Sequence, residues 1–391
     1  MHRIGRISLA IILSLAVALL SAWSGLAMWY RLPSAELGRA AACAILISFG
    51  IGTVMALFSR FRFRAVVLFI AAFAAVLVWW STIKPLDDAE WAPDVARQVT
   101  GTLDGNLLTL KDVRDFEWRS DIDFAEHWTT RTYDLSTVQT ADLFMSYWAG
   151  PKMAHVMMSF GFSDGRYLAW SIEVRRRVGG KFSPIADLFK SNPLVIIAAD
   201  ERDVIGVRSN VRGEDVQIYR LKASPDAARS LLLEYVSDGN ALSTKPAFYN
   251  SITTNCTTTI VKMMRAVGDP IPFDWRLIVN GYLPEYAYDR GALDTRLPIS
   301  TLREFAHIDD RARKSGLSPD FSRLIRVGVP YPHREYRFRK GIADGPKRQG
   351  GCLVELALVV SWSSSSCFFA SPRRSARASG REIESMAADH V

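Results

Sequence analysis

The sequence has few residues of the types that bind metals, and its charge is not arranged for nucleic acid. Among 391 residues there are 4 Cys and 6 His. No histidine pair at i, i+4 and no H-E-x-x-H motif occurs, so we expect no zinc site, and we expect no cofactor of another kind. The net charge is +8, but no basic stripe with interleaved aromatic residues crosses the middle of the chain. We therefore expect no nucleic-acid partner.

Ionisable residues are absent from three long apolar runs, residues 7–30, 40–58 and 65–83. Each run has the ~19 to 20 residues that a helix needs to cross a hydrocarbon core of ~30 Å. The first run could also be a cleavable signal peptide, because Ser24 to Ala27 are small enough to cut, but it is long and two further runs follow it. We predict three retained transmembrane helices in residues 1–84. Without internal charges they are typical of an anchor rather than a transport path.

The arginines around the apolar runs predict the orientation of the anchor. Arg3 and Arg6 precede the first run, and the loop between the second and third runs carries Arg60, Arg62 and Arg64. The loop between the first two runs has only Arg31 and Arg39, partly offset by Glu36. The positive-inside rule then places the N-terminus and the second loop in the cytoplasm. Everything after Lys84 is consequently extracytoplasmic, and the aromatic pairs Trp29-Tyr30 and Trp79-Trp80 lie at the outer interface.

Composition divides the rest of the chain into two parts. Residues 85–337 have an ordinary globular composition, with short alternating runs such as 217–221 and helical runs such as 225–236. This mixture predicts an α+β domain. Residues 338–391 contain a double glycine, a serine run and scattered arginines without an amphipathic period. We expect that tail to be disordered or non-native.

One cysteine, Cys256, lies alone in the predicted domain, although extracytoplasmic cysteines are normally paired. The apolar residues after it follow i, i+3, i+4, i+7 spacing and predict an amphipathic helix over about 256–267, ended by Gly268. Thr254 or Asn255 would be the N-cap. In the first turn of a helix, unpaired N–H groups stabilise a thiolate and could also hold an oxyanion. The alternative is a small buried residue at a helix start.

A histidine and a glutamate face each other on a predicted hairpin. Alternating apolar residues predict strands over 154–162 and 167–174. A two-residue loop would put their apolar faces on opposite sides, whereas a three-residue loop, Ser163 to Gly165, pairs residues whose numbers sum to 328 and aligns the faces. His155 then lies opposite Glu173, which could orient the imidazole and complete a Cys–His–Glu arrangement. The alternative is a solvent-facing ion pair.

Several short motifs between about Trp91 and Pro332 are specific when taken together. They are Val113-Arg114-Asp115-Phe116, Trp128 with Tyr133-Asp134-Leu135, His155 with Ser159-Phe160-Gly161-Phe162, Ser171-Ile172-Glu173-Val174-Arg175, Glu201-Arg202-Asp203, and Phe248-Tyr249-Asn250 leading to Asn255-Cys256-Thr257-Thr258. With these motifs the chain resembles the N-terminal periplasmic domain of Lnb-type lipoprotein N-acyltransferases. That domain is similar to circularly permuted papain-like thiol enzymes of the NlpC/P60 kind.

The resemblance implies Cys256 as nucleophile, His155 as base and Glu173 as orienting partner. It implies a papain-like fold and a multi-pass protein of the bacterial inner membrane whose catalytic domain is periplasmic. The activity it implies is a thiol acyltransferase that works through a cysteine acyl-enzyme, with membrane lipid and lipoprotein as partners. One alternative is a cell-wall peptidase or amidase of the NlpC/P60 type, and another is a non-catalytic membrane-tethered binding module. Acyltransferases of this kind carry membrane helices after the domain, whereas this chain carries them before it.

Overall fold

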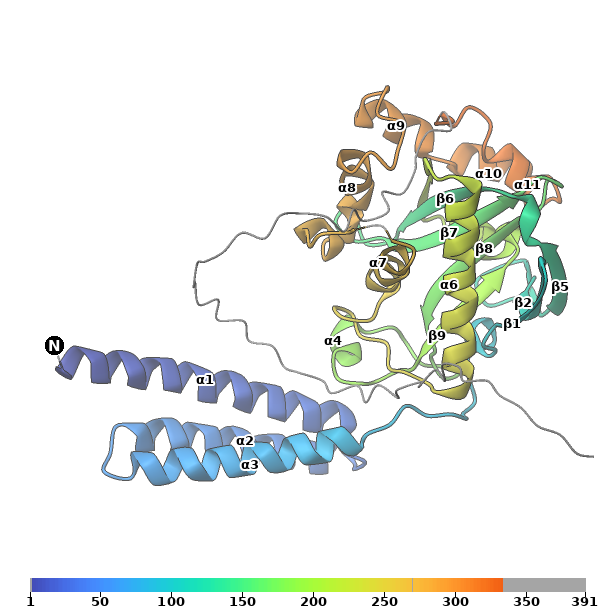
Figure 1. The fold of residues 1–391 in the computed structure, drawn as a ribbon. Coiled ribbons are helices and arrows are strands. Elements are labelled where there is room, and N and C mark those ends of the chain that lie inside the picture. Colours follow the sequence, from blue (N-terminus) through green and yellow to red (C-terminus); the bar gives the residue numbers. More distant parts are fainter. Residues whose placement is uncertain (1, 269, 333–391) are drawn as a thin grey trace, which may run out of the picture. The chain divides into compact units, whose positions relative to one another are not determined.

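Three long helices open the computed structural model, which describes residues 2–268 and 270–332 (Figure 1). They are α1 (His2–Arg31), α2 (Glu36–Leu57) and α3 (Arg62–Thr82), and each is long and apolar enough to cross a membrane. They cover the three apolar runs to within one residue, and each begins three to five residues before its run. The predicted tail, residues 338–391, lies outside the described residues, so the structure does not bear on it.

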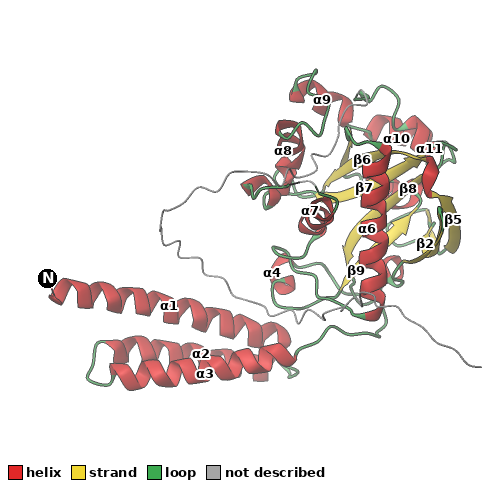
Figure 2. Cartoon of the chain, viewed as in Figure 1, coloured by secondary structure: helices red, strands yellow, loops and turns green. Residues whose placement is uncertain are grey.

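A mixed β-sheet forms the centre of the following domain (Figure 2). Its strand order is β1-β2-β9-β8-β7-β6-β10, with β5 also paired to β2. Neighbouring strands are antiparallel except β2 and β9. The strands are β1 (Thr100–Asp104), β2 (Leu107–Arg114), β5 (Trp128–Asp134), β6 (Val138–Tyr147), β7 (His155–Phe162), β8 (Tyr167–Val174), β9 (Leu194–Ala199) and β10 (Asp215–Arg220), and a separate pair consists of β3 (Glu117–Trp118) and β4 (Phe124–Ala125).

Helices and turns connect and cover the strands. The α-helices are α4 (Pro184–Asp187), α5 (Glu201–Val204), α6 (Pro225–Thr244), α7 (Cys256–Ala266), α8 (Leu283–Asp289), α9 (Ile299–Ala306), α10 (Asp309–Ser315) and α11 (Phe321–Leu324). The remaining turns are the 3₁₀ segments η1 (Pro93–Val95), η2 (Leu135–Thr137), η4 (Trp275–Leu277) and η5 (Asn280–Tyr282), together with one π-helical turn, η3 (Val207–Val211). The domain is therefore a mixed α/β structure, in agreement with the α+β class expected from the sequence.

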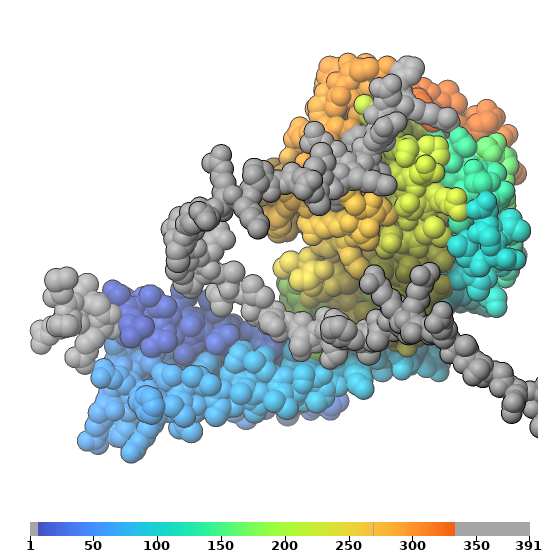
Figure 3. All heavy atoms as spheres, in the orientation of Figure 1, coloured from blue at the N-terminus to red at the C-terminus, as the bar shows by residue number. Residues whose placement is uncertain are grey.

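Both faces of the sheet are buried. On one face α6 and α7 pack on β7 and β8, where the rings of Trp170 and Tyr235 lie 5.2 Å apart. In the space-filling view α6 occupies the middle of the domain on this side (Figure 3). On the other face α5, α10 and α11 cover the side chains that alternate with these along the strands, including Met157 of β7 and Ala169 of β8. Side chains on either face of these strands are therefore shielded from water.

The hairpin of β7 and β8 adopts the register that the three-residue loop predicts. Paired residues run from Met157 with Ser171 to Gly161 with Tyr167, and each pair sums to 328. Gly165 has φ +86°, which a residue with a side chain rarely adopts, and its N–H donates to the carbonyl of Phe162. The two-residue alternative is therefore wrong. If the same register is continued toward the open end of the hairpin, His155 lies opposite Glu173.

Candidate active site

Cys256 is the first residue of α7, as the amphipathic pattern predicts. Of the two predicted N-caps the structure selects Asn255, whose Oδ1 accepts from the N–H of Thr258 at 2.9 Å, while the Asn255 N–H donates to Thr258 Oγ1 at 2.8 Å. This reciprocal capping box fixes the start of the helix. The thiol is free and only 5% exposed. It lies where the helix leaves backbone N–H groups without intrahelical acceptors.

His155, the first residue of β7, lines the same cavity as Cys256, and its imidazole lowers the pKa of the thiol. Its Nε2 lies 2.7 Å from Ser171 Oγ and 3.1 Å from Glu173 Oε1. Nε2 is therefore the imidazole nitrogen that faces the Ser171 hydroxyl and the Glu173 carboxylate. The backbone N–H of Val156, the next residue along β7, also lowers the pKa of the Cys256 thiol. The structure thus brings together all three residues that the sequence singled out.

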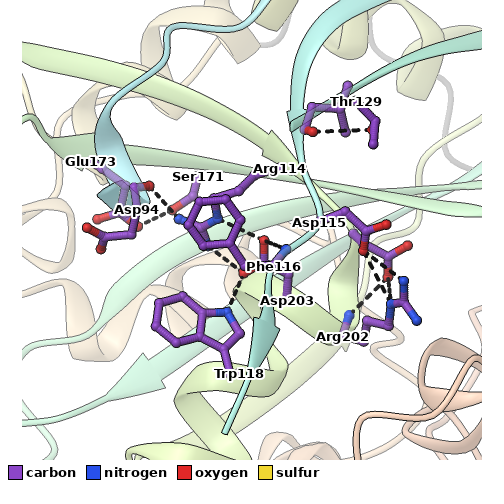
Figure 4. A network of polar contacts seen from close by, with 12 residues as sticks. Asp94, Arg114, Asp115, Phe116, Trp118, Thr129, Ser171, Glu173, Arg202 and Asp203 are labelled. Carbon is purple, nitrogen blue, oxygen red and sulfur yellow. Dashed lines mark hydrogen bonds and ion pairs between the residues drawn. The ribbon is translucent and has the colours of Figure 1, made fainter. Parts of the chain in front are cut away.

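The carboxylate of Glu173 is held by donors from three directions. Its Oε1 accepts from Ser171 Oγ at 2.6 Å and from Arg208 Nη2 at 3.0 Å, in addition to the contact with His155. Figure 4 shows Ser171 and Glu173 side by side at the edge of a larger polar network. Glu173 cannot rotate without breaking these contacts, so it presents one oxygen to the imidazole in a fixed position.

The charges of this cluster support one another. Burial alone would lower the pKa of His155, but the Glu173 carboxylate and hydrogen bonds with Cys256 and Glu173 raise that pKa to about 9. Burial would raise the pKa of Cys256, yet the hydrogen bond and charge of His155 lower it below its ordinary value. Burial also opposes ionisation of Glu173, but His155 and Arg208 hold its pKa well below its usual range. The arrangement favours a thiolate beside an imidazolium.

Arg208 is a site residue that the sequence did not indicate. It lies in the π-helical turn η3, and its side chain is only 9% exposed. Its guanidinium pairs with Glu173 at 3.0 Å and with Glu214, three residues after η3, at 3.2 Å. Glu214 in turn accepts from Ser146 of β6. The periodic spacing of apolar residues does not reveal a buried arginine such as Arg208, because its partner Glu173 lies on a strand 35 residues earlier in the chain. Single-turn π-helices are frequent at functional sites, but they have no sequence signature of this kind.

Asn280 joins the start of β7 to the start of α7. Its Oδ1 accepts from the Ala154 N–H at 2.9 Å, and its Nδ2 donates to the Ala154 carbonyl at 2.8 Å and to Thr257 Oγ1 at 2.9 Å. Ala154 directly precedes His155, and Thr257 directly follows Cys256. One amide therefore fixes the distance between the histidine and the cysteine, and the sequence analysis missed this residue.

The three predicted residues line a cavity of about 420 Å³. Its other walls combine apolar side chains with buried and half-buried polar ones; among them are Trp148, Met153, Phe182, Tyr249, Leu277, Ile278, Arg176 and Arg208. Polar and apolar side chains share the wall about equally, and a cavity of this size with convergent polar groups is typical of a small-molecule or acyl-group site.

A buried ion-pair network connects to the site through Arg176 (Figure 4). Arg114 binds Asp203 through two hydrogen bonds of 2.8 and 2.9 Å, and the Asp203 carboxylate also accepts from the Trp118 indole at 2.7 Å. Arg114 further donates to the carbonyl of Asp94, whose carboxylate binds Arg176 on the cavity wall. Two motifs distant in the sequence, at residues 113–116 and 201–203, therefore meet in space.

Two further histidines, His127 and His307, do not line the cavity. His127 is exposed. His307 is also exposed, and its Nδ1 lies 2.7 Å from Asp215 Oδ1, with Asp309 close by. The Asp309 carboxylate accepts from the Val216 N–H at 3.4 Å. Asp215, His307 and Asp309 could together hold a metal ion by their residue types, but contacts within the protein already explain their positions. The sequence spacing did not predict this group.

Fold and site together define a membrane-anchored α/β domain with a cysteine, a histidine and a glutamate gathered at one cavity. Residues 124–281 match the family model described as the Lnb N-terminal periplasmic domain, which confirms over these residues the resemblance that the motifs carry. Cys256, His155 and Glu173 all lie in the matched segment. No curated protein and no solved structure matched the chain. The chain is thus a membrane-anchored protein with a periplasmic domain.

Proposed function

We propose that the protein is a thiol acyltransferase of the bacterial inner membrane that works through a Cys256 acyl-enzyme. The single observation that carries the proposal is the contact of Cys256 with His155, whose imidazole is held by Glu173. This is the nucleophile, base and orienting group of a papain-like thiol enzyme. The order histidine before cysteine along the chain agrees with the circularly permuted, NlpC/P60-like form of that fold.

The chemistry follows from the arrangement. His155 takes the thiol proton, and the sulfur forms a bond to the carbonyl carbon of an acyl ester while N–H groups of the first turn of α7 receive the oxyanion. The carbon–oxygen bond then breaks, and the imidazolium gives its proton to the leaving alcohol. An amine next attacks the thioester carbonyl and loses a proton to His155. The carbon–sulfur bond then breaks, which releases the acyl group as an amide and returns Cys256 as a thiolate beside the imidazolium. Water in place of the amine would make the protein a hydrolase.

The apolar side of the cavity wall, with Trp148, Met153 and Phe182, offers a surface for a lipid acyl chain, and the membrane anchor keeps such chains close by. A lipoprotein amine is the proposed acceptor. The polar side of the wall, with Arg212, Glu214 and Asn280, would suit the peptide groups of a cell-wall peptide, which is the alternative substrate.

The test is to incubate the full chain, in phospholipid nanodiscs, with a lipoprotein that has a free N-terminal amine. Mass spectrometry should detect an acyl adduct on Cys256 and acylated lipoprotein, and the Cys256→Ser variant should give neither. Unchanged lipoprotein together with cleaved wall peptides in a parallel digest would reject the transferase in favour of the peptidase. If neither product forms and the Cys256→Ser variant behaves like wild type in cells, the protein would be a non-catalytic binding module.

A further inference from the structure

Exposed apolar side chains ring the mouth of the cavity. They come from four loops and the short helix α4, and each is between 41% and 56% exposed: Trp148, Met153, Phe182, Ile185, Ile252 and Ile278, which we call the apolar rim. Four of them line the cavity itself, and the other two directly follow lining residues. So many large apolar side chains around one opening are costly in water unless something covers them.

Contacts between the loops hold the apolar rim together. The rings of Trp148 and Phe182 lie 6.0 Å apart in a T-shaped arrangement. Ser251, next to Ile252, donates to the carbonyl of Pro184, next to Ile185, at 2.9 Å. The rim is therefore one surface formed by separate loops rather than a set of isolated side chains.

The α4 segment connects this surface to the membrane helices. Four residues beyond Ile185, the ring of Phe189 stacks on Tyr30 of α1 at 5.6 Å. Lys190 donates to the Trp80 carbonyl of α3 at 2.7 Å. Tyr30 and Trp80 belong to the aromatic pairs that the sequence places at the outer membrane interface. Because four residues span at most ~14 Å, the apolar rim begins close to that interface.

Exposed lysines flank the apolar rim. Lys152 precedes Met153, and Lys181 precedes Phe182. Large apolar side chains beside cations are the composition of segments that insert into the headgroup region of anionic bilayers, to a depth of ~5 to 10 Å. We propose that the apolar rim inserts into the outer surface of the membrane that anchors the chain, so that the cavity opens directly onto the lipid.

Four isoleucine positions give a matched test in the full chain. The native cysteines are replaced by serine, and single cysteines are placed at Ile185, Ile252 or Ile278, or at the control position Ile122, which is 92% exposed on another loop. Each cysteine carries an environment-sensitive fluorophore. The protein is reconstituted in phosphatidylcholine–phosphatidylglycerol nanodiscs, with or without lipids that bear a quenching nitroxide on the acyl chain.

The three rim probes should emit at shorter wavelength than the control and lose most of their emission to the nitroxide lipids, while the probe at 122 keeps its emission. Exchange of Lys152 and Lys181 for glutamate should reduce the quenching. Rim probes that behave like the control would overturn the proposal. Probes that emit at shorter wavelength without quenching would overturn it too, since a protein would then cover the rim. The Cys256→Ser background makes the result independent of catalysis.

Discussion

Replacing Glu173 by Gln tests whether its charge sets the reactivity of Cys256. The substitution keeps size and hydrogen-bonding groups but removes the charge that raises the pKa of His155 to about 9. A return of that pKa toward the ordinary ~6.5 corresponds to ~3 kcal/mol between the two protonation states. Since His155 and Cys256 stabilise each other's charge, the pKa of the thiol should rise, and turnover should fall by ~10- to 1000-fold.

The assay is the rate of Cys256 alkylation by iodoacetamide as a function of pH, in the full chain with its other cysteines replaced by serine. Wild type should show an inflection below the ordinary thiol pKa of ~8.5, and E173Q should show it at higher pH. A His155→Ala variant provides the reference for a thiol without its imidazole. An E173Q profile that superimposes on wild type, with only the melting temperature lowered, would refute the assigned role of the carboxylate.

Further predictions concern the groups around this centre. Arg208→Met should lower the pH of the alkylation inflection, because it removes the cation that opposes the charge of His155 while Glu173 keeps its contacts with Ser171 and His155. Arg212→Met, whose arginine pairs with the exposed Asp121, should leave the inflection unchanged, and equal shifts would contradict a specific effect of Arg208. Asp203→Asn should destabilise the fold by ~3 to 5 kcal/mol in chemical denaturation, since it leaves a buried arginine without its counter-charge, and an effect below ~1 kcal/mol would contradict this. Because the pKa of Glu173 is depressed in the folded state, its charge stabilises the fold above the unfolded pKa of ~4.3, and this stabilisation is lost as the pH falls through the folded pKa. The difference in melting temperature between wild type and E173Q should therefore shrink from pH 6 to pH 3, and a constant difference would argue against this linkage.

Local patterns in the sequence were sufficient to predict the elements that carry the site. The alternation of β7 and β8 with a glycine at the end of the turn determined the register, and the apolar spacing after Cys256 determined α7. These features depend on neighbours within a few residues. Their agreement with the structure reflects how strongly side-chain faces constrain a hairpin.

The sequence could not predict the groups that complete the site. The sequence allowed His155 and Glu173 to be a solvent-facing ion pair, because it did not show that α5, α10 and α11 cover that face of the sheet. Arg208 reaches Glu173 from another segment, and Asn280 connects two elements about a hundred residues apart in the chain. Contacts of this kind are determined by tertiary packing and leave no periodic trace in one sequence.

The turn at Ser163 to Gly165 has a consequence for how this protein can vary. It lies at the end of the hairpin opposite His155, seven residues along β7, which corresponds to ~23 Å. Surface turns ordinarily accept insertions and deletions readily. Here one residue more or less would reverse the faces of β8 relative to β7 and carry Glu173 to the opposite side of the sheet. We therefore expect the length of this distant turn to be as restricted as the identity of His155, while its residue types, apart from Gly165, vary freely.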